Sequence, residues 1–231
     1  MSLAIEQLEK DKNLIAYKQF WKFIAEDIKE NIISGRYKPG KRLKEAQLAE
    51  KYSVSKTPVR EAIRYLEGIG FVEMIPHTMI RVSEINKKEV QDLYSIQNAL
   101  ERLAALEALP NLSAKEYGEM EECAVLMEQY AEKKDYALYS KANNNFHSII
   151  WRASGNERLV EMLQNTHERI QRFYSVPRRF PDKFKELAAD HRKILEAIAQ
   201  KDADKLETLL RTHLQKQMKY ILDVLQKEKD L

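Results

Sequence analysis

The stretch SVSKTPVREAIRYLEGIG, residues 53–70, predicts one helix with two unlike faces. Its apolar side chains recur at three- and four-residue spacing, at Val59, Ala62, Ile63 and Leu66. Its cations recur every four residues on the other face, at Lys56, Arg60 and Arg64. The apolar face predicts a core contact, and the concentrated positive charge indicates an anionic partner.

The first residues of this helix favour the same kind of partner. Ser55 and Thr57 place hydroxyls where side chains cap free backbone N–H groups, and Pro58 fits the first turn. A helix end that offers N–H groups, hydroxyls and cations suits the phosphate-lined major groove of DNA. The alternative is an exposed charged helix with ordinary caps.

The flanking sequence predicts a winged helix-turn-helix. The expected order is a helix over 20–34, a turn at 38–43, a short helix over 44–53, the helix described above, and strands over 71–75 and 79–85. The two strands form a two-stranded wing. This plan favours DNA reading over the plain charged helix.

The segment IISGRYKPGKRLKEAQLAEKYSVSKTPVREAIRYLEGIGFVEMIPHTMIRV resembles the winged helix-turn-helix of GntR-type bacterial transcriptional regulators, and the match covers about residues 20–82. The resemblance implies that Lys56, Thr57 and Arg60 contact DNA. Lys56 stands where the family usually has Arg, so it lacks the planar two-pronged donor of that residue. Met79 stands where the wing usually has Gly. The full expected DNA-binding set is Arg36, Arg42, Ser55, Lys56, Thr57, Arg60, Arg64 and His77.

Residues 86–231 predict an all-α domain. Helical patterns follow one another with short breaks, and about six helices are expected between 87 and 228, with short connections between antiparallel neighbours. The only cysteine, Cys123, excludes an intrachain disulfide and is expected to be a buried helix residue.

Three histidines occupy similar places in successive helices of this domain. They are His147, His191 and His213, and Asn143 lies one turn before His147, so that both side chains point the same way. Each histidine taken alone is more simply a satisfied core or surface residue. Spacing does not show whether the three converge, because convergence depends on the fold.

The domain resembles the FCD effector-binding domain of the FadR-like branch of GntR regulators, through FHSIIWRASGNERL, HRKILEAIAQKD and a later THL. The resemblance implies that Asn143, His147, His191 and His213 hold a divalent metal, with Zn or Ni suiting three imidazoles. Asn143 replaces the usual Asp and makes a weaker, neutral ligand, so a metal-free polar pocket is the alternative. The resemblance also implies an effector site with Arg169, Arg172 and Tyr174. A further departure is Gln97, where the family often has Arg.

The composition fits this interpretation. The chain has 231 residues, 44% of them hydrophobic, enough for two domains with real cores. Residues 1–85 hold 15 Lys and Arg against 12 Asp and Glu, whereas residues 86–231 hold 24 of each, so the formal excess lies in the N-terminal third. No apolar run reaches the roughly 20 residues of a membrane-spanning helix, and no signal peptide is evident, which predicts a cytoplasmic protein without membrane contact.

The predicted organisation is an N-terminal extension over 1–17, a winged helix-turn-helix over 18–85 and a helical effector domain over 86–231, with a hinge near 83–89. We expect a non-enzymatic, homodimeric repressor that binds a pseudo-palindromic operator and is controlled by a small carboxylate or sugar acid bound at the metal. Two alternatives remain. One is a metal-dependent helical hydrolase with Glu168 or Asp190 as base. The other is a sensor that has lost DNA binding.

Overall fold

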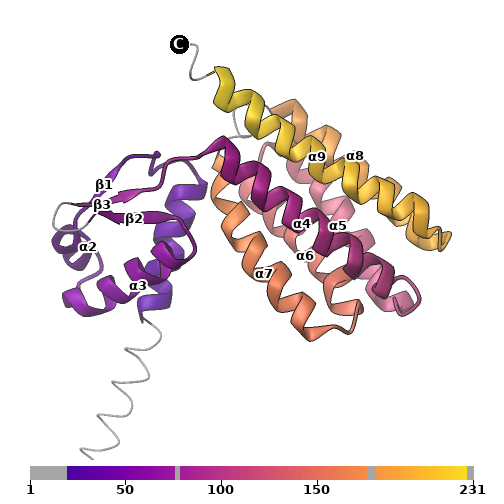
Figure 1. The fold of residues 1–231 in the computed structure, drawn as a ribbon, viewed down its shortest axis with the longest axis horizontal. Helices are drawn as coiled ribbons and strands as arrows, with labels where there is room; N and C mark the ends of the chain where they lie inside the picture. Colours follow the sequence, from indigo (N-terminus) through magenta and orange to yellow (C-terminus); the bar gives the residue numbers. More distant parts are fainter. Residues whose placement is uncertain (1–19, 76–78, 176–180, 228–231) are drawn as a thin grey trace, which may run out of the picture. The chain divides into compact units, whose positions relative to one another are not determined.

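The computed structural model describes residues 20–75, 79–175 and 181–227, which fall into two compact units, Met1–Glu84 and Ile85–Leu231 (Figure 1). The predicted extension over 1–17 and His77 lie outside the described residues. The predominance of helix and the small N-terminal sheet confirm the predicted fold class.

The first unit is a winged helix-turn-helix. After a helix over residues 20–33, its elements are β1 (Arg42–Leu43), α2 (Glu45–Lys51), α3 (Lys56–Gly68), β2 (Val72–Ile75) and β3 (Met79–Val82). The sheet has the order β1-β3-β2 with both pairs antiparallel. The two expected strands are present as β2 and β3, but the prediction of a two-stranded sheet was wrong, because β1 adds a third strand. The missed β1 has two residues, too few for an alternation signal, and it forms only by pairing with β3.

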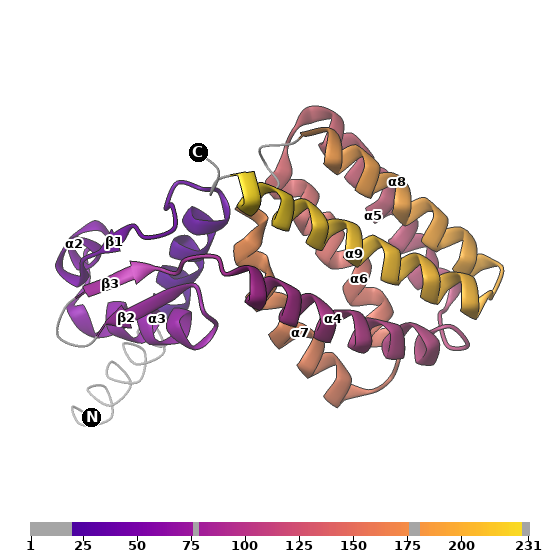
Figure 2. The ribbon, with the colours of Figure 1, turned by 45° about the horizontal axis from the view of Figure 1, so that its top comes forward.

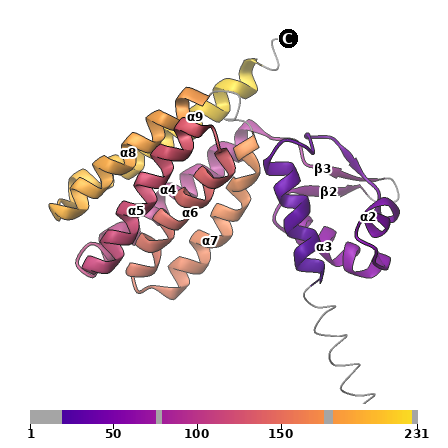
Figure 3. The ribbon, with the colours of Figure 1, turned by 180° about the vertical axis from the view of Figure 1, so that it is seen from behind.

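The apolar face of α3 forms the centre of this unit, as its periodicity predicts. Val59, Ile63 and Leu66 are buried against the helix over 20–33 and the sheet, together with Phe71. Asp27 ties that helix to the end of α2, since it accepts hydrogen bonds from Lys51 Nζ at 2.7 Å and from the Tyr52 hydroxyl at 2.6 Å. Figure 3 shows α3 in this unit together with α2 and the strands β2 and β3.

The second unit is a helical bundle. Its described elements are α4 (Lys87–Ala108), α5 (Ala114–Lys133), α6 (Tyr136–Ala153), α7 (Glu157–Gln171), the 3-10 turn η1 (Arg172–Ser175), α8 (Pro181–Ala199) and α9 (Ala203–Lys227). Six α-helices in this part of the chain match the expected number. α4 packs against α6, α7 and α9, while α8 packs against α5 and α9 (Figure 2). The helices α4, α6, α8 and α9 therefore share an interior.

The start of α4 lies within residues 83–89, where a hinge is predicted, and shortens the irregular part of that segment. Residues 83–86 have no regular structure, but Asn86 caps α4 by accepting from the Lys88 amide at 2.8 Å, so Lys87 to Glu89 form a helical turn. Cys123 is buried on α5, as expected. Among the described helices, none combines the length and apolar composition needed to cross a bilayer.

Candidate metal centre and nucleic-acid interface

Three histidines meet in the interior of the second unit. His147 comes from α6, His191 from α8 and His213 from α9, and one ring nitrogen of each lies within 4.8 Å of the others. Nε2 of His147 and Nε2 of His191 are 3.4 Å apart. All three side chains are buried, with exposed fractions of 3%, 0% and 0%. Packing of three helices thus supplies the convergence that spacing alone did not show.

Each imidazole has a different acceptor facing its Nδ1. His191 Nδ1 donates to the Leu187 carbonyl at 2.9 Å, His147 Nδ1 lies 3.3 Å from Glu101 Oε2, and His213 Nδ1 lies 3.7 Å from Asp190 Oδ2. The Leu187 carbonyl keeps the proton of His191 on Nδ1 and leaves its Nε2 lone pair toward the centre, whereas Nδ1 of His147 and of His213 face their carboxylates without a hydrogen bond. The arrangement therefore brings ring nitrogens of three imidazoles to one point, as a transition-metal site requires.

Asn143 adds an oxygen to this set. The residue is 5% exposed, and its Oδ1 has no hydrogen-bond partner among the described residues. A buried amide oxygen without a partner is costly unless a ligand satisfies it. Asn143 lies one turn before His147 on α6, so its oxygen stays the predicted fourth ligand, one that would bring no charge.

Buried ionisable groups around the centre show shifted pKa values. Burial lowers the pKa of His191 well below 6.5, and the neighbouring His213 and His147 lower it further. Burial likewise lowers the pKa of His213, against the raising effect of Asp190. Burial alone would raise the pKa of the Glu101 carboxyl, but His147 and Gln97 outweigh it, so that the pKa lies below its usual value. Burial thus keeps His191 and His213 neutral, while the Glu101 carboxyl is held ionised.

Sequence reasoning missed Glu101 and Gln217 as parts of this site. Glu101 is 3% exposed and accepts from Gln97 Nε2 at 2.8 Å, one turn earlier on α4. Gln217 Nε2 lies 2.7 Å from His213 Nε2, one turn along α9. The i to i+4 spacing of both pairs was visible in the sequence, but which of many such pairs is buried was not.

A cavity with about 440 Å³ of atom-free space, part of it open solvent, borders the histidine cluster, since its lining residues Leu187 and Gln217 contact His191 and His213. Polar groups on its wall come from Asn143, Gln217, Ser140 and four tyrosines, and apolar ones from Phe184, Leu187 and Ile221. The tyrosines are Tyr94, Tyr139, Tyr174 and Tyr220. Burial raises the pKa of each tyrosine, so all four are neutral hydroxyls. The hydroxyls of Tyr94 and Tyr139 are buried without a hydrogen-bond partner among the described residues.

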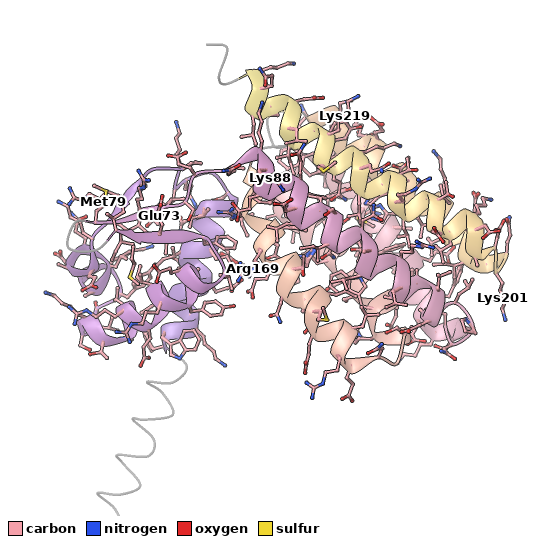
Figure 4. The ribbon with its side chains drawn as sticks, viewed as in Figure 1. Glu73, Met79, Lys88, Arg169, Lys201 and Lys219 are labelled. Atoms are coloured by element: carbon pink, nitrogen blue, oxygen red, sulfur yellow. The ribbon has the colours of Figure 1, made fainter. Side chains whose placement is uncertain are left out.

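The structure separates the three predicted effector residues. Tyr174 lines the cavity, whereas Arg169 is exposed on α7 (Figure 4) and is not among the lining residues. Arg172 is 5% exposed and pairs with Glu89 in the first turn of α4. Burial lowers the pKa of Arg172, although Glu89 opposes this. The cation that the sequence placed at the effector therefore binds a carboxylate of the protein, a contact between residues far apart in the sequence.

The polar face of α3 carries the predicted DNA-binding residues. Ser55, Lys56, Thr57, Arg60 and Arg64 are all exposed. Ser55 occupies the N-cap position, but its side chain makes no capping hydrogen bond, so the predicted hydroxyl cap was wrong there. Its backbone ψ of 167° belongs to extended chain, and its side chain leaves the first N–H groups of α3 without that cap.

The other predicted DNA contacts lie around α3. Arg60 Nε pairs with Glu45 Oε2 of α2 at 2.9 Å while its side chain stays 56% exposed. Arg36 and Arg42 are exposed, in the loop before the sheet and on β1. Met79 opens β3 opposite Ile75 of β2. Two residues along β3, Arg81 Nε pairs with Glu73 Oε1 at 2.6 Å across the wing.

Comparison with known proteins agrees with both units. Residues 21–82 match the model of bacterial regulatory proteins of the gntR family, and residues 92–216 match the FCD domain. The HTH-type transcriptional regulator YdhC of Bacillus subtilis is 24% identical over 234 residues, 98% of this chain and 100% of that protein. The HTH-type transcriptional repressor RspR of Escherichia coli is 24% identical over 216 residues, 92% of each chain.

McbR of Escherichia coli is similar in sequence and in structure. It is 30% identical over 147 residues, 64% of this chain and 66% of that protein. Its solved structure, titled McbR/YncC, superposes with a TM-score of 0.77 at 25% identity, over 88% of this chain and 97% of that one. These relatives are regulators rather than enzymes, which removes the hydrolase alternative. This chain belongs to the gntR family of bacterial transcriptional regulators and carries an FCD domain as its second unit.

Proposed function

We propose that this regulator is a cytoplasmic homodimeric repressor whose operator binding is controlled by a small organic acid bound beside a metal in the FCD domain. The observation that carries the proposal is the meeting of His147, His191 and His213 next to a cavity. A buried cluster of this kind is expensive to maintain without a ligand. Its presence in a chain that also carries a DNA-reading unit supports a ligand-controlled switch.

The DNA side of the proposal rests on α3. The exposed Lys56, Thr57 and Arg60 at its first turns would contact bases and phosphates in the major groove, with Arg64 further along the same face. Arg60 would exchange its pairing with Glu45 for a phosphate, which carries the stronger field of a polyanion. A homodimer would place two such helices on two half-sites of a pseudo-palindrome.

The ligand side rests on the metal centre and its cavity. Asn143, His147, His191 and His213 would hold a divalent ion, with Zn and Ni favoured by the imidazoles. Such an ion supplies an open coordination position for an anionic oxygen. The tyrosine hydroxyls would bind the remainder of the acid, with Tyr174 in contact. Arg172 would act through Glu89 rather than by touching the ligand.

Operator binding is tested with DNA from the promoter region of the protein's own gene. Arg60→Ala is expected to weaken binding by about tenfold and to reduce the slope of log affinity against log salt by about one, because one phosphate contact is lost. The control is Arg158→Ala, which removes an exposed arginine of α7 paired with Glu161. Unchanged affinity and slope for Arg60→Ala would refute the recognition-helix assignment. Absence of binding by the unchanged protein would support the sensor that has lost DNA binding.

The metal is tested by elemental analysis of protein loaded with Ni²⁺ or Zn²⁺ and then dialysed. His191→Ala is expected to remove bound metal, whereas His167→Ala is expected to retain it. His167 is also a buried histidine of this unit, but its Nε2 is 2.8 Å from Asn144 Oδ1 and it is not part of the cluster. Equal metal in both variants would sink the site.

A further inference from the structure

Asp190 of α8 is a buried carboxylate beside the histidine cluster, and Lys216 of α9 binds both of its oxygens. Lys216 Nζ lies 3.0 Å from Asp190 Oδ1 and 2.8 Å from Asp190 Oδ2. The side chain of Asp190 is 8% exposed and that of Lys216 is 30% exposed. Charge-assisted hydrogen bonds to both oxygens, partly shielded from water, fix the direction in which the carboxylate points.

His213 lies on the other side of this carboxylate and makes no hydrogen bond with it. His213 Nδ1 is 3.7 Å from Asp190 Oδ2, too far for a hydrogen bond, and has no other partner among the described residues. Gln217 Nε2 lies 2.7 Å from His213 Nε2. Because an amide nitrogen only donates, His213 Nε2 accepts, and the proton of the neutral ring is on Nδ1. A buried N–H group thus faces a carboxylate without bonding to it, which is energetically costly.

We propose that Asp190 is a positioning residue for His213 and that Lys216 lowers the affinity of the cluster for a divalent metal by holding Asp190 away from it. This rests on the proposed metal site. A carboxylate that accepts from the second ring nitrogen orients a metal-binding histidine, and its loss weakens metal affinity about 10- to 100-fold. Lys216 keeps Asp190 from making this bond. The consequence is a weaker site, suited to an ion that is gained and lost rather than to a permanent structural ion.

The neighbouring charges allow Asp190 to turn toward His213 once Lys216 releases it. Glu186 Oε1 is 3.7 Å from Lys216 Nζ, so the lysine keeps an anionic partner on α8. Lys193 Nζ is 3.6 Å from Asp190 Oδ1, but the Lys193 side chain is 57% exposed, and it therefore restrains the carboxylate less than Lys216 does. A movement of Asp190 Oδ2 by about 1 Å would bring it within hydrogen-bond distance of His213 Nδ1.

The first test measures Ni²⁺ affinity by competition with a chelating dye, in Lys216→Met, in Asp190→Asn and in the double variant. We expect Lys216→Met to tighten Ni²⁺ binding by about tenfold, the lower end of the effect of such carboxylates. This gain should largely disappear in the Asp190→Asn background, which leaves only the direct repulsion between the lysine and the ion. Lys216→Arg keeps a cation at Asp190 and is expected to retain the weak binding. The matched control is Lys219→Met, at an exposed lysine of α9 (Figure 4).

The second test needs no metal. In metal-free protein labelled with ¹⁵N-histidine, Lys216→Met is expected to move the Nδ1–H proton signal of His213 downfield, because this proton gains a carboxylate acceptor. Lys219→Met should leave the signal in place. A signal that does not move in Lys216→Met would refute the positioning of His213 through Asp190.

The outcomes separate this inference from the proposed function. Ni²⁺ affinity that Lys216→Met does not change would overturn the inference and leave the metal site standing. Equal tightening with and without Asp190→Asn would show that Lys216 acts by its charge alone, and would overturn the role of Asp190. If only Lys216→Met binds Ni²⁺, the inference holds and the proposed metal control fails; if neither protein binds it, both fail. Because Lys216→Met and Lys216→Arg leave Asp190 in place, a folding defect in Asp190→Asn would not remove the test.

Discussion

The carboxylate of Glu101 offers a quantitative test of how the metal centre is organised. Its Oε2 lies 3.3 Å from His147 Nδ1, and its Oε1 accepts from Gln97 Nε2 at 2.8 Å. In Glu101→Gln one carboxylate oxygen becomes an NH₂ group, and this group must then face one of two donors, His147 Nδ1–H or the Gln97 amide. The variant therefore loses a buried negative charge and also destabilises the Nδ1–H form of His147 that leaves Nε2 toward the metal.

The expected loss of metal affinity follows from what is known of carboxylates that hold the second ring nitrogen of a metal-binding histidine. Their substitution weakens metal affinity by about 10- to 100-fold, or about 1.4–2.8 kcal/mol. Competition of Ni²⁺ or Zn²⁺ between protein and a chelating dye measures it. The control is Glu107→Gln on the same helix, where Oε2 lies 3.3 Å from Asn156 Nδ2 and outside the cluster. If Glu101→Gln and Glu107→Gln bind metal equally, Glu101 does not orient His147, and the reasoning fails.

Three further predictions concern pH, DNA reading and stability. The unfolding free energy of the metal-free protein should fall as pH drops below 6.5, by up to about 1.4 kcal/mol per pH unit for His191. The reason is that the unfolded chain takes up a proton that the folded, buried imidazole does not. Urea titrations at neutral and acid pH measure this free energy, and a profile that does not change with pH would contradict the prediction. Lys56→Arg should sharpen the preference for guanine at one half-site position by about 1–3 kcal/mol, measured by selection of bound sequences, and an unchanged preference would refute a base contact. Phe71→Ala, at a fully buried position, should destabilise the first unit by about 3–5 kcal/mol. The fluorescence of Trp21, measured in a Trp151→Phe background, reports unfolding of this unit in urea, and an unshifted transition would contradict the prediction.

The N-terminal unit could be predicted almost completely because its signals are local. The apolar spacing of α3 and the turns around it specify elements within a few residues of their observed bounds. The two errors depend on contacts outside the immediate sequence. The strand β1 exists through its register with β3, where Arg42 lies opposite Arg81, and Ser55 holds the N-cap backbone conformation without the side-chain bond.

The histidine cluster was predictable only in part because it is assembled from distant segments. The histidines could be identified one by one, but their meeting depends on how α6, α8 and α9 pack. The sequence gives no sign that Glu101 belongs to the cluster, because its contact with His147 depends on the packing of α4 against α6. Arg172 was predicted to bind the effector, but in the structure it pairs with Glu89 at the start of α4, a distant contact that the sequence does not indicate.

That pairing suggests how the cavity could act on the start of the second unit. Tyr94 and Tyr174 line the cavity and also pack in one cluster with Val90, Phe173 and Ile85. Arg172 lies two residues before Tyr174 in η1 and binds Glu89 in the first turn of α4. A ligand that repositions Tyr174 therefore acts on η1 and, through Arg172, on the first turn of α4, which begins three residues after Glu84. For switching, the acid must favour one arrangement of this turn, because a ligand with equal affinity for both arrangements shifts neither.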